Sequence, residues 1–237
     1  MEMYSIENIS SLIEQFKDKS PETMLNYFMG KFGHRLALSS SLSIEDQTIT
    51  DMMLKIDRNA RIFTLDTGRL FPETYQLIDK TNKKYDIKME IFCPQANLLQ
   101  DFVREYGINP FYESIEKRHH CCEVRKLEPL SRAFDTVDVW VCGLRKSQSI
   151  TRTDMQMIEW DEQHAKLKLN PLINWTEEQV WEYVKEKHVP YNELYKKGFP
   201  SIGCEPCTRA VKQGEDIRSG RWWWEDPNHR ECGLHRK

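Results

Sequence analysis

Strand-like and helix-sized segments alternate through the first 190 residues of this 237-residue chain. Short apolar runs are typical of buried strands, and they lie at residues 35–38, 61–66, 88–92 and 137–142. Helical patterns follow the first two runs, at residues 45–55 and 72–84. Because parallel strands need crossovers of this kind, the order predicts a parallel twisted sheet with helices on both faces. The expected fold class is therefore α/β.

The patterning changes toward both ends of the chain. We expect residues 1–30 to form an N-terminal helical segment, residues 31–215 an α/β domain and residues 216–237 a C-terminal tail. Thr176 suits the N-cap of one more helix, which continues through residues 179–187. After Pro190 the regular pattern fades, and the sequence becomes dense in Gly, Pro, Cys, Trp and Arg.

Composition excludes several classes of partner. With 34 basic and 37 acidic residues, the chain has no excess charge that would favour a nucleic acid or an acidic membrane. No secretory signal opens the sequence, and no run reaches the ~20 apolar residues of a membrane span. We therefore expect a cytoplasmic protein. In that reducing compartment, seven cysteines favour metal binding and catalysis over a disulfide framework.

Four of the cysteines form two pairs, Cys121-Cys122 and Cys204-x-x-Cys207, with 81 residues between them. Four thiolates suit either tetrahedral zinc or an iron-sulfur cluster. Adjacent side chains diverge, so two neighbouring cysteines reach separate iron atoms more easily than one small zinc ion. This favours a 4Fe-4S cluster held by all four cysteines. A redox pair at Cys204-x-x-Cys207, a vicinal disulfide, or a zinc site completed by neighbouring histidines are the alternatives.

The remaining cysteines differ in their surroundings. Cys93 and Cys142 fall in or beside predicted strands, where inert buried thiols are expected. Cys232 instead lies in the cation-rich tail, among Arg230, His235 and the two basic residues that follow. Because nearby cations lower a thiol pKa, Cys232 is the candidate nucleophile.

Polar turns follow three of the predicted strands, at the sheet edge where α/β folds bind ligands. The first turn offers small hydroxyls and a helix N-terminus to an anion, although it lacks the lysine and glycines of a Walker A motif. A Ser-rich N-cap is the alternative. The third turn carries arginines that could clamp an oxyanion, or could simply form a solvated face. Candidate ligand-binding residues in the three turns are Ser40, Ser41, Ser43, Glu45, Asp46, Asp66, Gly68, Arg145 and Arg152.

Several motifs together resemble one family. They are Lys117-Arg118-His119-His120-Cys121-Cys122 with Arg125-Lys126, Gly203-Cys204-Glu205-Pro206-Cys207, residues 218–224, residues 231–235, and Leu65-Asp66-Thr67-Gly68. This set is similar to the assimilatory adenylylsulfate (APS) reductases, within the phosphoadenylylsulfate (PAPS) reductase family. The resemblance covers about residues 36 to 235.

The resemblance implies an adenine nucleotide α-hydrolase-like fold and a cytoplasmic oxidoreductase of sulfate assimilation and cysteine biosynthesis. Cys232 would attack the sulfur of APS, expel AMP and hold the sulfonate as an S-sulfocysteine, from which a separate thioredoxin or glutaredoxin releases sulfite. The cluster would act as a structural and electrostatic element linked to the substrate by Lys126. Arg218, Arg221 and His235 complete the implied substrate-binding set.

Three alternatives stay open at this point. The chain could reduce PAPS, or both nucleotides, although the cluster favours APS. An ATP-using sulfur transferase would need a Ser-Gly-Gly-x-Asp-Ser loop, and residues 39–46 lack its glycine pair. A zinc-stabilised binding module could present Trp222, Trp223 and Trp224 to a partner. A homo-oligomer is compatible with all of these.

Overall fold

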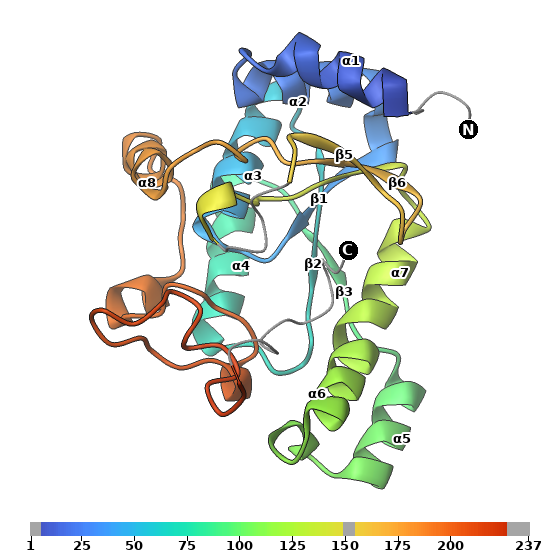
Figure 1. The fold of residues 1–237 in the computed structure, drawn as a ribbon, viewed down its shortest axis with the longest axis vertical. Helices are drawn as coiled ribbons and strands as arrows, with labels where there is room; N and C mark the ends of the chain where they lie inside the picture. The colour runs from blue at the N-terminus through green and yellow to red at the C-terminus, as the bar shows by residue number, and fades with distance from the viewer. Residues whose placement is uncertain (1–5, 149–154, 227–237) are drawn as a thin grey trace. The chain divides into compact units, whose positions relative to one another are not determined.

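The computed structural model describes residues 6–148 and 155–226. In this part of the chain the strands form a six-stranded sheet in the order β3-β2-β1-β4-β6-β5 (Figure 1). The strands are β1 (Leu36–Ser40), β2 (Arg61–Leu65), β3 (Glu90–Phe92), β4 (Val139–Val141), β5 (Ile158–Asp161) and β6 (Lys166–Leu169). The four strands predicted from apolar runs are confirmed, each within a few residues of its expected bounds.

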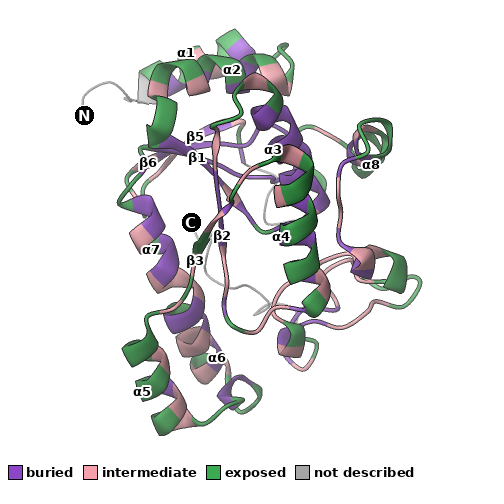
Figure 2. Cartoon of the chain, turned by 180° about the vertical axis from the view of Figure 1, so that it is seen from behind, coloured by how far each residue is buried: buried purple, intermediate pink, exposed green. Residues whose placement is uncertain are grey.

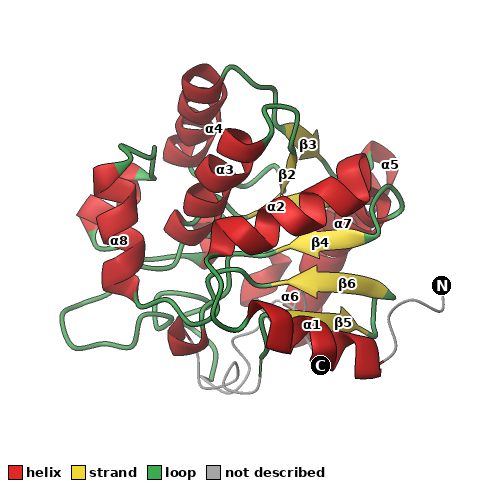
Figure 3. Ribbon diagram, turned by 90° about the horizontal axis from the view of Figure 1, so that it is seen from above, coloured by secondary structure: helices red, strands yellow, loops and turns green. Residues whose placement is uncertain are grey.

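Strand directions confirm the α/β class and add one antiparallel edge. β1 pairs in parallel with β2 and with β4, and β4 pairs in parallel with β6. β5 runs antiparallel to β6, as the opposed arrows in Figure 3 show. The sequence reading did not predict this hairpin, because its two strands are four residues each and alternate with charged side chains instead of forming an apolar run. The expectation of a wholly parallel sheet was therefore wrong at this edge.

The helices that were predicted begin and end close to their expected positions. α3 spans Ile44–Ile56, α4 spans Pro72–Tyr85, and α8 spans Glu177–Glu186 behind the Thr176 cap. Near the N-terminus, α1 (Ile6–Phe16) and α2 (Pro21–Phe32) are also helical. Residues 44 to 54 of α3 are all buried, including its polar side chains. Buried polar groups need partners, and Gln47 donates to Thr81 Oγ1 at 2.8 Å and to the Pro190 carbonyl at 2.9 Å.

The chain divides into two compact units. Unit 1 comprises Met1–Thr64, Leu77–Glu90 and Thr136–Tyr191, and unit 2 comprises Leu65–Gln76, Ile91–Asp135 and Asn192–Lys237. Unit 1 contains most of the sheet together with α3 and α8. The three-segment division of the sequence at residues 30 and 215 remains a prediction. Within residues 6–148 and 155–226, no helix has the length and apolar character that crossing a membrane requires.

Unit 2 is built around a continuous run of helix. α6 (Ile115–Cys122) passes into a π-helical stretch (Glu123–Leu127) and then into α7 (Glu128–Phe134). The Ser114 hydroxyl caps α6 by accepting from the Lys117 N–H at 3.1 Å. Figure 2 shows that α7 is largely buried whereas α5 (Ala96–Tyr106) is mostly exposed, with only Phe102 of α5 buried. Single π-helical turns inside longer helices often accompany functional residues.

Candidate active site

In unit 1, Asp46 holds the Ser-rich turn between β1 and α3 in one conformation. Its Oδ2 accepts hydrogen bonds from the Ser41 N–H and hydroxyl, at 2.7 and 2.6 Å. Its Oδ1 accepts from the Gly143 N–H at 2.9 Å, at the end of β4. Burial raises the pKa of Asp46 to about 6, and the bonds from Ser41 and Gly143 offset part of that rise. One carboxylate therefore joins the turns after two neighbouring strands.

The hydrogen bond from the Gly143 N–H to Asp46 requires glycine at position 143. A Cβ at this position would lie 2.4 Å from Asp46 Oδ1 and 2.8 Å from the Asp46 nitrogen. Both distances are shorter than a Cβ can approach another atom, and the second atom belongs to the backbone, which cannot easily move aside. Glycine thus allows β4 to approach the first turn of α3 closely enough for the hydrogen bond.

The same turn carries the α3 N-terminus. The Ser43 hydroxyl caps the helix by accepting from the Asp46 N–H at 3.2 Å, and the Ser40 hydroxyl accepts from the Leu42 N–H at 3.1 Å. Leu42 itself has a φ of 64°, in the left-handed region. The Ser-rich N-cap is therefore present in the structure, and the anion site at the same helix N-terminus stays a prediction.

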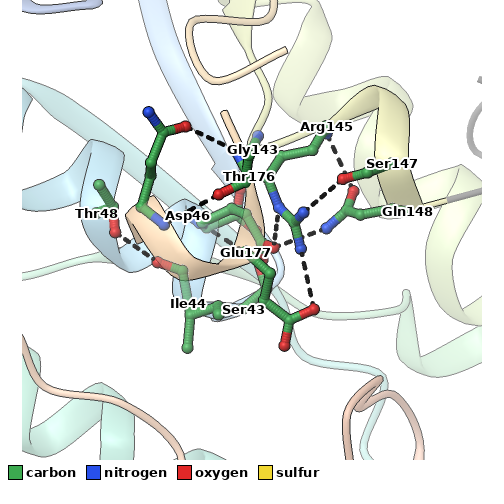
Figure 4. A network of polar contacts seen from close by, with 12 residues as sticks. Ser43, Ile44, Asp46, Thr48, Gly143, Arg145, Ser147, Gln148, Thr176 and Glu177 are labelled. Carbon is green, nitrogen blue, oxygen red and sulfur yellow. Dashed lines mark hydrogen bonds and ion pairs between the residues drawn. The ribbon is translucent and has the colours of Figure 1, made fainter. Parts of the chain in front are cut away.

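Arg145 and Glu45 form a buried ion pair beside this turn. Arg145 Nε donates to Glu45 Oε1 at 2.8 Å, and both side chains are 4% exposed. Gln148 donates to the same carboxylate oxygen at 2.9 Å, and Arg145 also donates to the Ser147 hydroxyl at 2.7 Å. The charge of Arg145 is therefore balanced within the protein. Figure 4 shows its guanidinium directed also at Ser147 and at Glu177, whose carboxylate oxygen lies 3.7 Å from Arg145 Nη2.

In unit 2, the turn after β2 is organised by Asp66. Its Oδ1 accepts from the Gly68 N–H and from the Tyr75 hydroxyl, both at 2.8 Å. Burial and this hydrogen bond raise the pKa of Tyr75 to about 12. Gly68 has a φ of 67°, which glycine adopts without strain. These hydrogen bonds to Asp66 Oδ1 fix the conformation of the turn.

All four paired cysteines line a single pocket of unit 2. Cys121 and Cys122 end α6, and Cys204 and Cys207 flank the 3₁₀ turn Glu205–Cys207. The six cysteines within the described residues are free thiols. In those residues, no three His, Cys, Asp or Glu side chains converge closely enough to hold one metal ion.

Cations and one hydroxyl surround these thiols. The pocket wall includes Arg69, Arg125, Lys126 and Arg221. Burial raises the pKa of Cys207 to about 12, while Lys126 and Arg221 act in the opposite direction. Arg125 similarly opposes the burial that raises the pKa of Cys121. A pocket lined by four thiols and several cations fits a metal cofactor bound by thiolates, because the cations would offset the net negative charge of such a centre.

Thr67 connects the cysteine pocket with the Asp66 turn. Its hydroxyl lies 3.2 Å from Cys204 Sγ, and its carbonyl accepts from Arg125 Nη1 at 2.6 Å. Leu70 also forms an isolated β-bridge with Cys204. The sequence reading quoted Thr67 within the Leu65-Asp66-Thr67-Gly68 motif but did not name it as a site residue, although its place between two predicted site residues was an available signal.

The structure gathers the predicted site residues into two groups. Unit 1 brings together Ser40, Ser41, Ser43, Glu45, Asp46 and Arg145, and unit 2 brings together Asp66, Gly68, Lys126, Arg221 and the four paired cysteines. Arg218 is half-buried, and its N–H donates to Asp216 Oδ1 at 2.8 Å. Arg152, Cys232 and His235 lie outside the described residues.

The two unpaired cysteines of the described part behave differently from each other. Cys142 is buried, and burial raises the pKa of its thiol, as expected for an inert core cysteine. Cys93 is exposed, so the expectation that it would be buried was wrong. It follows β3, a strand of only three residues, in which the Phe92 carbonyl accepts from the Asp66 N–H. The chain leaves the sheet before Cys93 can be covered.

Comparison with known proteins places these features in one family. The phosphoadenosine phosphosulfate reductase domain model matches residues 35–210. A protein of Neisseria meningitidis serogroup A, named adenosine 5'-phosphosulfate reductase, is 46% identical over 98% of this chain and 95% of its own length. The crystal structure of a PAPS reductase from Candida auris, a phosphate complex, is 29% identical, with a TM-score of 0.76 over 88% of this chain and 98% of that one.

A more distant neighbour shares the fold alone. It is an NH3-dependent NAD synthetase from Campylobacter jejuni, 10% identical with a TM-score of 0.51 over 82% of this chain and 79% of that one. This likeness agrees with the α/β fold expected from the sequence. The family match covers both polar turns of unit 1 and all four paired cysteines. The chain belongs to the phosphoadenosine phosphosulfate reductase family.

Proposed function

We propose that this chain reduces adenosine 5'-phosphosulfate to sulfite and AMP in sulfate assimilation. The observation that carries the proposal is the gathering of Cys121, Cys122, Cys204 and Cys207 around one pocket. Relatives named APS reductase match this chain at 46% identity over almost its full length, which supports the same substrate.

The Ser-rich turn of unit 1 would bind the nucleotide phosphate. Its helix N-terminus supplies amide donors and a favourable dipole for an anion. Ser41 and Ser43 already contact Asp46, so their hydroxyls are held in place before substrate binds. Preorganised donors bind an anion without the cost of ordering them first. The role of Glu45 and Asp46 would then be to position this turn.

The four cysteines of unit 2 would hold a 4Fe-4S cluster. The adjacency of Cys121 and Cys122, whose side chains diverge, favours a polynuclear cluster over one zinc ion. When bound, the cluster would supply a structural and electrostatic element, not the electrons for reduction. Lys126, Arg218 and Arg221 would offset the negative charge of the phosphosulfate.

The chemical step would belong to Cys232. Its thiolate attacks the sulfur of APS, an S–S bond forms, the S–O bond breaks, and AMP leaves with that electron pair. One thiol of a thioredoxin or glutaredoxin type of protein then attacks the Cys232 sulfur and releases sulfite. Its second thiol resolves the mixed disulfide. The reductant thus ends as a disulfide, and the two electrons account for sulfate becoming sulfite.

A sulfite-release assay tests the proposal directly. Purified protein with its cofactor, thioredoxin, thioredoxin reductase and NADPH should produce sulfite and AMP from APS. With PAPS in place of APS, we expect slower release. Cys232→Ser should bind APS without forming a sulfonated protein. Absence of sulfite from APS, or full turnover by Cys232→Ser, would refute the proposal.

A further inference from the structure

Arg221 is a buried cation in the wall of the cysteine pocket. The residue is 7% exposed, and it lines the same pocket as Cys204 and Cys207. Two backbone contacts fix its main chain. One is an isolated β-bridge with Thr208, and the other is a hydrogen bond from the Arg221 N–H to the Arg218 carbonyl at 2.9 Å. The place of the guanidinium is then decided by the groups that bound it.

An aromatic ring is the first of these groups. The guanidinium carbon of Arg221 lies 4.7 Å from the centre of the Trp222 ring. Guanidinium groups stack on aromatic rings because they are planar and weakly hydrated. Trp222 is 1% exposed and packs against Phe111 and Cys207, so its ring has no room to move aside. The ring is therefore a fixed wall for the Arg221 side chain.

The backbone of Gly203 is the second group. A Cβ at position 203 would lie 2.3 Å from Arg221 Nη2 and 2.6 Å from the guanidinium carbon. In the same segment, the Ser201 hydroxyl accepts from Arg221 Nη1 at 3.4 Å. Gly203 does not have a positive φ, so its backbone conformation alone would accept other residues. The structure therefore requires glycine here for the space that it leaves to the guanidinium.

A guanidinium held in this way is prepared for an anion. Its N–H groups lie in one plane and match two oxygens of a phosphate or a sulfate. A side chain with restricted rotamers loses little entropy when it binds, so less of the interaction energy is spent on ordering it. The backbone of Gly203 and the ring of Trp222 supply that restriction before any substrate is present.

We propose that Gly203 is a positioning residue for substrate binding. By leaving space beside Trp222, it fixes the Arg221 guanidinium in the orientation that binds the phosphosulfate. The inference rests on the proposed function, in which Arg221 offsets the charge of that group. Gly203 acts through Arg221 alone, and its effect is on the affinity for the substrate.

The test is a double-mutant cycle on the full-length, cofactor-loaded protein. Gly203→Ala adds a methyl group in the space of the guanidinium. Arg221→Lys keeps the charge but removes the planar fork, and a third variant combines both changes. Gly214→Ala is the matched control from unit 2. Its φ of 87° strains alanine, yet no atom of the described residues would lie within 4 Å of its Cβ.

The readouts are the APS dissociation constant, the kcat and KM of sulfite release, and cofactor content. For Gly203→Ala, we expect the dissociation constant to rise about tenfold or more, as for the loss of one charged hydrogen bond. KM should change more than kcat. In the Arg221→Lys background, Gly203→Ala should raise the dissociation constant less than about twofold, because the displaced group is absent. Gly214→Ala should bind APS as wild type does.

Additive effects of the two substitutions would show that Gly203 supports the pocket without acting through Arg221, and they would overturn the proposal. Wild-type affinity for APS in Gly203→Ala would overturn it as well. If Gly203→Ala also lowers cofactor content, through its neighbour Cys204, then Arg221→Lys decides. That variant leaves the backbone beside Cys204 unchanged, and wild-type affinity in it would refute the need for a positioned guanidinium.

A crystal structure of the Gly203→Ala protein separates this inference from the proposed function. It should show the Arg221 guanidinium displaced from its place against residue 203. If wild type releases sulfite from APS and the guanidinium has not moved in the variant, only the role of Gly203 is refuted. If wild type releases no sulfite from APS, the proposed function itself fails.

Discussion

At the scale of single residues, Asp46 gives this protein a stability that depends on pH. Burial raises the pKa of Asp46 from 3.8 to about 6. The folded protein therefore binds a proton here more readily than the unfolded chain does, and stability falls as pH rises from about 4 through 6. At ~1.4 kcal/mol per pKa unit, the loss amounts to about 3 kcal/mol.

Asp46→Asn should remove this dependence. Denaturant unfolding of wild type and variant at about pH 4 and about pH 7.5 measures it, since all other titrating groups are common to both proteins. The variant loses acceptor capacity toward Ser41 and Gly143, so it should be less stable than wild type at the lower pH. Relative to wild type it should gain up to about 3 kcal/mol at the higher pH. A difference that stays constant with pH would contradict the buried charge.

Single residues also show which parts of the site the sequence could reveal. The cysteine pairs were found because cysteine spacing has few interpretations in a reducing compartment. The buried ion pair between Arg118 and Glu225 was not predicted, because arginine and glutamate are usually exposed and these two lie 107 positions apart. Arg145 was expected at an oxyanion, and the structure shows its charge balanced by Glu45. An ion pair between residues far apart in the chain leaves no local sequence pattern from which it could be predicted.

At the scale of elements, two helix caps provide a matched comparison. The Ser114 hydroxyl caps α6, and the Thr176 hydroxyl caps α8 by accepting from the Gln179 N–H at 3.3 Å. Replacing either residue with alanine should lower the free energy of unfolding by about 1 kcal/mol. Only Ser114→Ala should also speed loss of iron to a chelator, because α6 carries Cys121 and Cys122. Equal iron retention in the two variants would show that α6 does not control the pocket.

Elements were predicted best where the apolar pattern is long. The 13-residue α3 and the five-residue strands β1 and β2 were recovered closely, because the two buried strands are short apolar runs separated by a segment of helical length. The β5–β6 hairpin was missed because Glu159 and Lys168 face each other in its register and pair by charge. A strand whose buried positions include such a pair lacks the apolar run from which a buried strand is predicted. The π-helical stretch likewise has no sequence signature.

At the scale of the whole molecule, removal of the cofactor should affect the two units unequally. Burial raises the pKa of Cys121 and Cys207, so without a metal these thiols would take up protons and the pocket would lose its ligand-derived stability. Hydrogen exchange should then rise in residues 115–127 and 204–222 of unit 2. In residues 36–64 and 139–169 of unit 1, exchange should change little. A uniform increase across both units would refute this separation.

The 81 residues that separate Cys122 from Cys204 also have a consequence during protein synthesis. Translation proceeds at ~5–20 residues per second, so the first cysteine pair emerges roughly 4–16 s before the second. During that interval α6 presents two adjacent thiols with no partners from the far end of the chain. The ribosome therefore sets an order of events for the proposed cluster: its assembly would have to wait for Cys207, and the early pair would have to be kept reduced until then.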